Sequence, residues 1–327
     1  MPRPASPRRA LLAALASLAV LSACTGNADE GVASQPTPAV AATAATSTAE
    51  ARLVAAVAAL EDTSPAGVAA REAAFTGPAL ESAHAWAKTL PAKTAQQQAD
   101  AELSTTGAKV LGISRIGDEP RQILVQTTLE KTKAAVLALL VAEAPAAEFK
   151  VAAITPMLAE ARVDELDPTS IGSGAIGDGA GLAAAPADVL QAFADSVAFP
   201  DPKQTTLLVE DPLTAQLRQS ARAQDKAVSA SGSFTQSHEP KGVIGGLRLK
   251  SGDGAIVFGT VVRTDSIALR RASQLTPSKD FTRLTGIKRI TSEASLTSNQ
   301  IIALVIPTSG AARIVAAADQ LVAGTGR

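Results

Sequence analysis

The chain has 327 residues, a formal net charge of −1 and two histidines. Aromatic residues make up 2% of it, with no tyrosine and one tryptophan, so the core must be filled by alanine, valine, leucine and isoleucine. A chain without excess positive charge lacks the electrostatic basis of nucleic-acid affinity. We therefore expect no nucleic acid as a partner.

The first 23 residues have the pattern of a secretory signal peptide. Three arginines within residues 1–9 precede an apolar run from Ala10 to Val20 that only Ser17 interrupts. This run is too short to span a hydrocarbon core of ~30 Å as a stable helix. Cys24, the only cysteine of the chain, comes just after it. A single cysteine cannot form a disulfide within the chain.

The stretch Leu21-Ser22-Ala23-Cys24 resembles the lipobox of bacterial lipoproteins. The resemblance implies cleavage between Ala23 and Cys24 and a diacylglyceryl lipid anchor on the Cys24 thiol. Two or more acyl chains hold a protein stably on a membrane. We therefore expect a cell-envelope protein on the outer face of the cytoplasmic membrane, with the membrane as its first partner. The alternative is an ordinary secreted protein with a cysteine at its cleavage site.

Two stretches of the mature chain have the composition of linkers. Residues 24–47 are polar and small and show no periodicity, which predicts a flexible tether. Residues 164–186 are rich in Gly, Asp and Ser, a composition that does not pack a core. Two segments, 48–163 and 187–327, are left to form globular structure.

These two segments look like copies of one unit, in which two helices precede an antiparallel meander. Leu53 in a helical pattern aligns with Val189, Pro78 before a second helix aligns with Pro212, and Asp118 in a hairpin aligns with Asp253. The offset is 134 to 136 residues in each case, which indicates a tandem repeat. In the first copy we expect strands around 108–115, 121–130, 134–142 and 147–156.

Beyond the hairpin the offset rises to 165, because "ALLVAEAP" from residue 138 pairs with "ALVIPTSG" from residue 303. The second copy therefore contains an insertion of about 30 residues within 265–298. The segment has a net charge of +3, whereas the rest of the mature chain totals −7. It is either a solvated loop or a docking surface for an anionic envelope component or an acidic protein. Its basic residues are Arg270, Arg271, Lys279, Arg283, Lys288 and Arg289.

The order of elements predicts an α+β fold with two tandem repeats, each made of helices packed on a curved antiparallel sheet. This order resembles the cone-shaped, nuclear-transport-factor-like superfamily. Behind a lipobox, and with an alanine-rich composition typical of GC-rich genomes, the tandem is similar to actinobacterial envelope lipoproteins.

Candidate site residues are few. His84 fits a helix surface or a cavity rim better than a catalytic base, since no tyrosine is available to complete an acid–base pair. Trp86 either caps a ligand cavity or packs in the core. His238, beside Glu239 and Pro240, is expected in a loop. The sequence contains no cluster of metal ligands and no phosphate-binding loop, so we expect no metal and no cofactor.

We therefore expect a non-enzymatic lipoprotein that acts as an interaction or ligand-binding scaffold. A second hypothesis is a small-molecule binder or enzyme that uses a cone-shaped cavity with Asp, Glu and Arg side chains. A solute-capture lipoprotein serving a transporter ranks third, because the alternating βαβ pattern of such proteins is missing.

Overall fold

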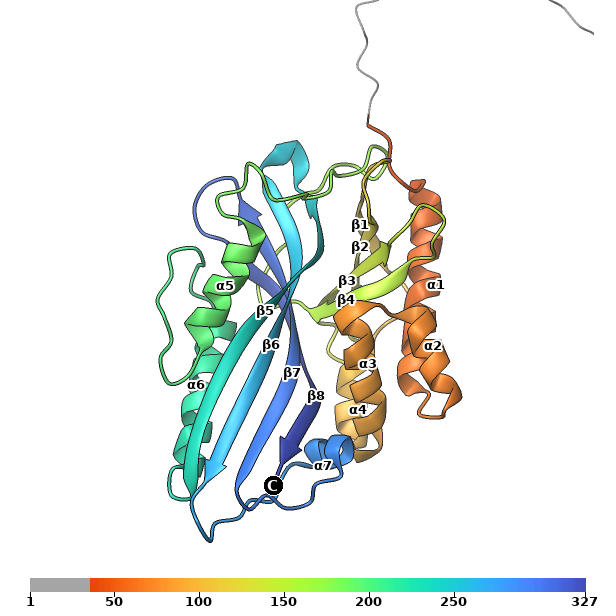
Figure 1. Ribbon diagram of the computed structural model, residues 1–327. Helices are drawn as coiled ribbons and strands as arrows, with labels where there is room; N and C mark the ends of the chain where they lie inside the picture. Colours follow the sequence, from red (N-terminus) through yellow and green to blue (C-terminus); the bar gives the residue numbers. More distant parts are fainter. Residues whose placement is uncertain (1–35) are drawn as a thin grey trace, which may run out of the picture. The chain divides into compact units, whose positions relative to one another are not determined.

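The structure, a computed structural model, describes residues 36–327 (Figure 1). The expected signal peptide, the cleavage site at Ala23 and the lipid-attachment residue Cys24 lie outside the described residues. Residues 36–327 have an α+β architecture with two four-stranded antiparallel sheets, as the element order predicted.

The first half places its helices before its sheet. The helices are α1 (Ala42–Glu61), α2 (Ala66–Ala74), α3 (Gly77–Thr89), the short 3-10 helix η1 (Leu90–Ala92) and α4 (Ala95–Ala101). The strands are β1 (Lys109–Ile113), β2 (Arg121–Thr128), β3 (Ala135–Ala142) and β4 (Lys150–Pro156). Consecutive strands are neighbours in the sheet, so these strands form the expected meander.

The second half repeats the order with fewer helices and longer strands. Its elements are α5 (Pro186–Val197), α6 (Pro212–Val228), β5 (Gly232–Arg248), η2 (Lys250–Gly252), β6 (Gly254–Leu269), α7 (Lys279–Thr285), β7 (Glu293–Pro307) and β8 (Arg313–Gly326). The second sheet has the order β5-β6-β7-β8, which is the same meander.

Helix α1 begins at Ala42, inside the stretch 24–47 that composition assigned to the tether. Its buried residues follow a helical spacing, since Ala45, Ala49, Leu53 and Ala56 are all fully buried. Alanine also occupies much of the exposed face, so the two faces differ little in hydrophobicity and the stripe is hard to recognise in the sequence. The end of the expected tether is therefore part of the folded unit.

The second sheet is buried on both faces. Phe258, Ile301 and Val305 pack into a core that they share with α1 and the first sheet. The intervening residues Val257 and Ile302 pack instead against α5. This two-sided burial explains the continuous apolar runs of β6 and β7, because neither face of these strands needs polar residues for water. The two halves thus share one core and form one compact unit.

The connection 164–186 contains no helix or strand before α5 begins at Pro186, but it is packed. Ser173 is fully buried and forms a backbone bridge with Ser114, while Ala175 forms one with Leu247. Ile176 is 5% exposed and belongs to the core beneath α5. The expectation that this composition does not pack a core was wrong, because backbone pairing holds the segment against both sheets.

The excess length of the second half has two sources. Strand β6 has 16 residues against 8 in β2, and β7 has 15 against 8 in β3. The connection between β6 and β7, residues 270–292, is longer than its counterpart 129–134 and contains α7. Phe281 and Ile290 of this connection are buried in a small core of their own with Ala294.

Candidate functional site

A mainly apolar cavity of about 450 Å³, open to solvent, lies between the two halves. Helix α3 forms one wall through Ala79, Ser82 and Ala83, and the first sheet contributes its strands β3 and β4. The second sheet forms the opposite wall through β7 and β8. A volume of this size accommodates a drug-sized organic molecule. Its apolar lining residues are Leu60, Phe75, Ala79, Ala83, Trp86, Ala101, Leu103, Leu129, Val136, Ile154, Pro156, Ile301, Ala317 and Ala318.

Small side chains leave this space open. Ala79 and Ala83 lie one turn apart on the buried face of α3, and Ala318 of β8 lies opposite Ile301 on the sheet face that lines the cavity. A hydrogen bond spans the two halves at this place, since the Asn299 amide donates to a Glu81 carboxylate oxygen over 2.8 Å. Asn299 is 3% exposed whereas Glu81 is exposed, so the bond runs from the buried sheet to the surface of α3 and holds this helix beside β7.

The lining also contains a few polar residues, which are Ser82, Asp100, Asn299, Asp319 and Gln320. The Ser82 hydroxyl is buried and has no hydrogen-bond partner among the described residues. Asp100 is paired with Lys131 at 2.9 Å, and the hydrogen bond from Lys131 lowers its pKa. An apolar cavity with a few polar groups is the usual form of a site for a small organic ligand.

Trp86, singled out from the sequence as a candidate cavity residue, lines this cavity. It also lines an adjoining concavity of about 390 Å³ that shares Leu60, Ala101 and Leu103 with the first. The Lys93 ammonium lies 5.5 Å from the centre of the Trp86 ring. The only tryptophan of the chain therefore stands between two apolar spaces.

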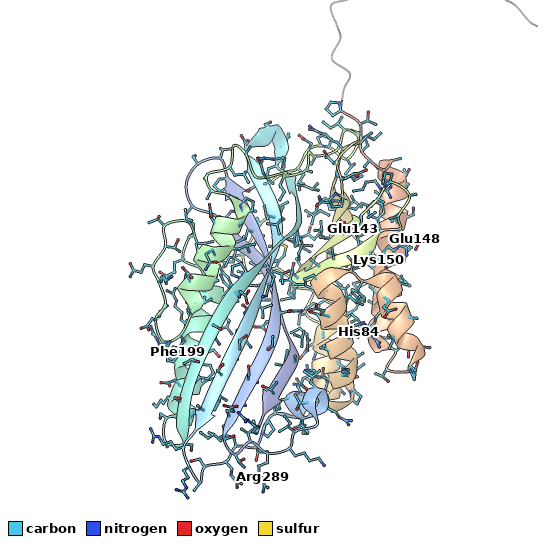
Figure 2. All side chains as sticks on the ribbon, in the orientation of Figure 1. His84, Glu143, Glu148, Lys150, Phe199 and Arg289 are labelled. Carbon is cyan, nitrogen blue, oxygen red and sulfur yellow. The ribbon has the colours of Figure 1, made fainter. Side chains whose placement is uncertain are left out.

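His84, its expected companion, is labelled in Figure 2. It is not among the residues that line the cavity. Its Nδ1 accepts a hydrogen bond of 3.2 Å from Nε of Arg71, which is 4% exposed. The Arg71 guanidinium also donates to the carbonyls of Ala59 and Asp62 at the end of α1, over 3.1 and 2.6 Å. His84 thus orients a buried arginine that satisfies the last carbonyls of α1.

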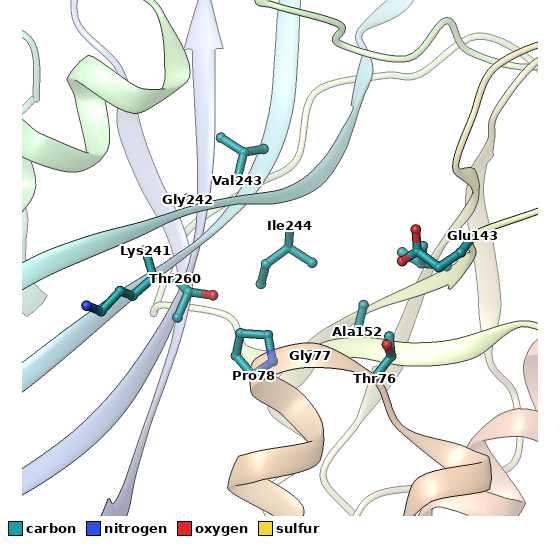
Figure 3. A pocket seen from close by; sticks show the side chains of 11 residues that line it. Thr76, Gly77, Pro78, Glu143, Ala152, Lys241, Gly242, Val243, Ile244 and Thr260 are labelled. Atoms are coloured by element: carbon teal, nitrogen blue, oxygen red, sulfur yellow. The ribbon is translucent and has the colours of Figure 1, made fainter.

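A smaller concavity of about 240 Å³ lies where the start of α3 meets β5 (Figure 3). Glu143 and Lys241 stand at its edges, and the bulged stretch 242–244 forms one wall. Thr260 is 2% exposed, and its hydroxyl lacks a hydrogen-bond partner within residues 36–327. Lys241 is already paired with Glu239 at 2.6 Å, so this concavity offers few free groups to a ligand.

A chain of polar side chains crosses the face of the second sheet that α5 covers. His238 Nδ1 lies 2.9 Å from Gln300 Oε1, and His238 Nε2 lies 3.1 Å from Gln236 Oε1. Gln236 donates to Asp265 over 2.7 Å, and Gln300 donates to Asp319 over 3.0 Å. The chain is closed by one cation, since Arg263 pairs with Asp319 and lies 3.4 Å from Asp265.

Burial controls the charges in this network. Burial lowers the pKa of His238 to about 4, helped by the charge of Arg263 and opposed by the bond to Gln300. Burial also raises the pKa of Asp265, although the charge of Arg263 and the hydrogen bond from Gln236 act to lower it. His238 is therefore neutral at physiological pH, and its ring packs edge-on against Phe193 of α5.

The placement of His238 in a loop was wrong, because it lies within β5. Phe234, Gln236 and His238 are buried at alternate positions, while the residues between them are exposed. That period of two in "SFTQSHEP" is the signal of a half-buried strand. The pattern is hard to recognise in the sequence because two of the buried positions, Gln236 and His238, are polar.

The six basic residues of the β6–β7 connection are all exposed, and Figure 2 labels Arg289 among them. None of the six takes part in an ion pair with another residue of 36–327, whereas Arg270 donates to the carbonyl of Ala230 over 3.4 Å. The connection thus folds on Phe281 and Ile290 and presents its cations to solvent.

Two searches within the described part of the chain gave negative results. No group of three or more His, Cys, Asp or Glu side chains is placed to hold a metal ion, and no described helix is both long and apolar enough to cross a membrane. Comparison with known proteins gave no match either, with no family model, curated protein or solved structure similar to the chain.

Proposed function

We propose that this protein is a lipid-anchored envelope lipoprotein that binds a small apolar or amphipathic molecule in the cavity between α3 and the second sheet. The observation that carries the proposal is the cavity, about 450 Å³ in volume and lined mainly by apolar side chains. An apolar surface of this kind is exposed to water unless a ligand covers it, and covering it is favourable. The polar groups from Ser82 and Gln320 provide hydrogen bonds for one polar end of such a ligand.

The anchor is the second part of the proposal. The lipobox-like stretch before Cys24 supports acylation of that thiol, which would hold the binding unit at the outer face of the cytoplasmic membrane. Replacing Cys24 with Ser should abolish lipid attachment, because a hydroxyl cannot replace the thiol in the transfer. Cell fractionation with palmitate labelling tests this, and a labelled, membrane-bound Cys24→Ser variant would contradict it.

The finer description of the fold belongs to the same proposal. Two meanders of identical strand order, each preceded by helices, support a duplicated cone-like unit in 48–163 and 187–327. In the duplication, Ala138 and Ala303 occupy equivalent places, each four residues before the end of its strand. Superposing the two halves of an experimental structure tests the duplication. Equivalent strands that do not superpose would refute it.

The alternative of an enzyme gains little support from the polar network. His238, Asp265 and Arg263 have the chemistry for acid–base work, but none of them lines a described concavity. The His238 ring nitrogens contact Gln236 and Gln300, and the ring packs against Phe193 of α5. Asp265 accepts a hydrogen bond from Gln236 and lies 3.4 Å from Arg263. A catalytic group must reach its substrate, so the binding function is favoured.

The single tryptophan provides the test of ligand binding. The full chain carrying Cys24→Ser is titrated with the neutral apolar fluorophore N-phenyl-1-naphthylamine, and energy transfer from Trp86 is recorded. We expect saturable binding with quenching of Trp86, because this residue forms part of the cavity wall. Ala83→Leu should weaken binding at least about 10-fold by filling the cavity, a change of ~1.4 kcal/mol.

The matched control is Ala58→Leu, the same substitution at an exposed position of α1. It should leave both affinity and quenching unchanged. Equal binding by the two variants, or binding without a response from Trp86, would show that the probe lies elsewhere and would refute the proposal. Thermal melting of each variant verifies that the fold is intact.

A further inference from the structure

The connection between β6 and β7 concentrates positive charge on a nearly neutral protein. Residues 270–290 contain six basic side chains and one acidic side chain, Asp280. All six cations are exposed, and none is paired with a carboxylate of the described chain. Six exposed cations within 21 residues create a positive potential that attracts an anion.

The one carboxylate in this stretch is neutralised from the other half of the molecule. Lys93, which follows η1, places its ammonium 2.5 Å from Asp280 Oδ2. The Lys93 side chain is only 15% exposed, because it also lies over the Trp86 ring. This ion pair fastens α7 to the first half and neutralises the one carboxylate within residues 270–290.

The contact creates a groove of about 550 Å³. Pro91 and Ala92 form one side, and the β6–β7 connection forms the other. The groove is lined by three cations and two hydroxyls, without a carboxylate or an aromatic ring. Its residues on the side of the connection are Thr276, Pro277, Lys279, Thr282, Arg283 and Lys288.

We propose that this groove binds a ligand that carries two or more phosphate groups. Arg283 presents a planar fork that matches two phosphate oxygens, and Lys279 and Lys288, which line the same groove, supply point charges. A ligand with a single carboxylate would neutralise only one of the three cations. A ligand with a charge of −2 to −4 would neutralise most or all of them. Because no aromatic ring lines the groove, recognition rests on the phosphates and not on stacking of a base.

The site is independent of the apolar cavity. The two concavities have no lining residue in common, and the Lys93 side chain lies between Trp86 on one side and Asp280 on the other. Failure of either proposal therefore leaves the other standing. The phosphates can belong to a free ligand or to an anionic lipid headgroup, and the two arms of the experiment distinguish these sources.

The first arm is calorimetric titration of the full chain carrying Cys24→Ser with inorganic tripolyphosphate at low ionic strength. A groove variant with Lys279→Gln, Arg283→Gln and Lys288→Gln is compared with a control that carries Arg270→Gln, Arg271→Gln and Arg289→Gln. Both variants lose three positive charges, but only the first loses them from the groove. We expect the groove variant to lose about 30-fold or more in affinity and the control less than about threefold.

The second arm is flotation with vesicles that contain cardiolipin, a lipid whose headgroup carries two phosphates, with and without tripolyphosphate. If the vesicles bind only when the groove residues are present, and tripolyphosphate displaces them, the phosphates belong to a lipid headgroup. If tripolyphosphate binds but the vesicles do not, the ligand is a free phosphate compound. If the two triple variants lose affinity equally, the binding depends only on net charge and the proposal is wrong. The proposal is also wrong if the parent chain does not bind tripolyphosphate. Because the six side chains are exposed, the melting temperatures of all three proteins should agree.

Discussion

At the scale of the residue, His238 is the clearest case of a side chain whose charge is set by its surroundings. It lies inside a polar network yet remains neutral, because burial beneath α5 opposes its protonation more than Gln300 favours it. The nearby charged groups are Arg263, Asp265 and Asp319, all on strands of the same sheet. Protonation of His238 would place a second cation beside Arg263 in a region with little water.

This arrangement predicts that stability falls as the pH drops from about 6.5 towards 4. Over this interval the unfolded chain protonates His238 but the folded chain does not, which costs the fold on the order of 3 kcal/mol. Asp265 acts in the opposite direction, since its raised pKa lets the folded state take up a proton first. Urea unfolding of the parent and of His238→Gln at intervals between pH 7.5 and 4.5 measures the slope. A slope that persists unchanged in the variant would contradict the assignment.

At the scale of the element, α7 is positioned by a glycine in the last strand. A Cβ at Gly324 would lie 2.4 Å from a ring carbon of Phe281 and 3.0 Å from the carbonyl oxygen of Ser295. Phe281 is the largest buried side chain of α7, so the absence of a side chain at Gly324 is what allows the helix to dock on β8.

Gly324→Ala should therefore displace α7 and cost about 1–3 kcal/mol, as overpacking of a core does. Because α7 and the residues after it hold the groove cations, the variant should also bind tripolyphosphate more weakly. Gly326→Ala is the matched control, since its Cβ would come no closer than 3.3 Å to Ile290. Chemical unfolding and calorimetry provide the two measurements. Equal effects of the two alanines would show that the contact with Phe281 does not position α7.

The elements differ in how far they could be predicted. The four strands of the first half lie within two to three residues of the predicted bounds, because each apolar run ends at a clear turn signal. Helix α1 was placed too late, since a stripe of buried alanine differs little from exposed alanine in sequence. The cavity could not be predicted beyond Trp86, because its walls come from α3 and β8, which are brought together only by the shared core.

At the scale of the whole molecule, the shared core predicts that residues 36–327 unfold as one unit. Phe193 belongs to the core beneath α5, in the second half, whereas Trp86 lies on α3 in the first. Phe193→Ala should lower the free energy of unfolding by about 3–5 kcal/mol. If the halves are coupled, the transition reported by Trp86 fluorescence shifts with that reported by circular dichroism. A Trp86 transition that stays in place would indicate two independent domains.

The meander order also has a kinetic consequence. Every strand pair within the two sheets joins neighbours along the chain, and apart from the β6–β7 connection the loops to be closed are short. The contacts around the cavity are of another kind, since the bond between Glu81 and Asn299 links residues 218 positions apart. Contacts of long sequence separation form late, because their loop-closure entropy must be offset by structure already present. We therefore expect the apolar cavity to be assembled after the two sheets, and while it is still open the apolar surfaces of both halves are exposed to neighbouring chains.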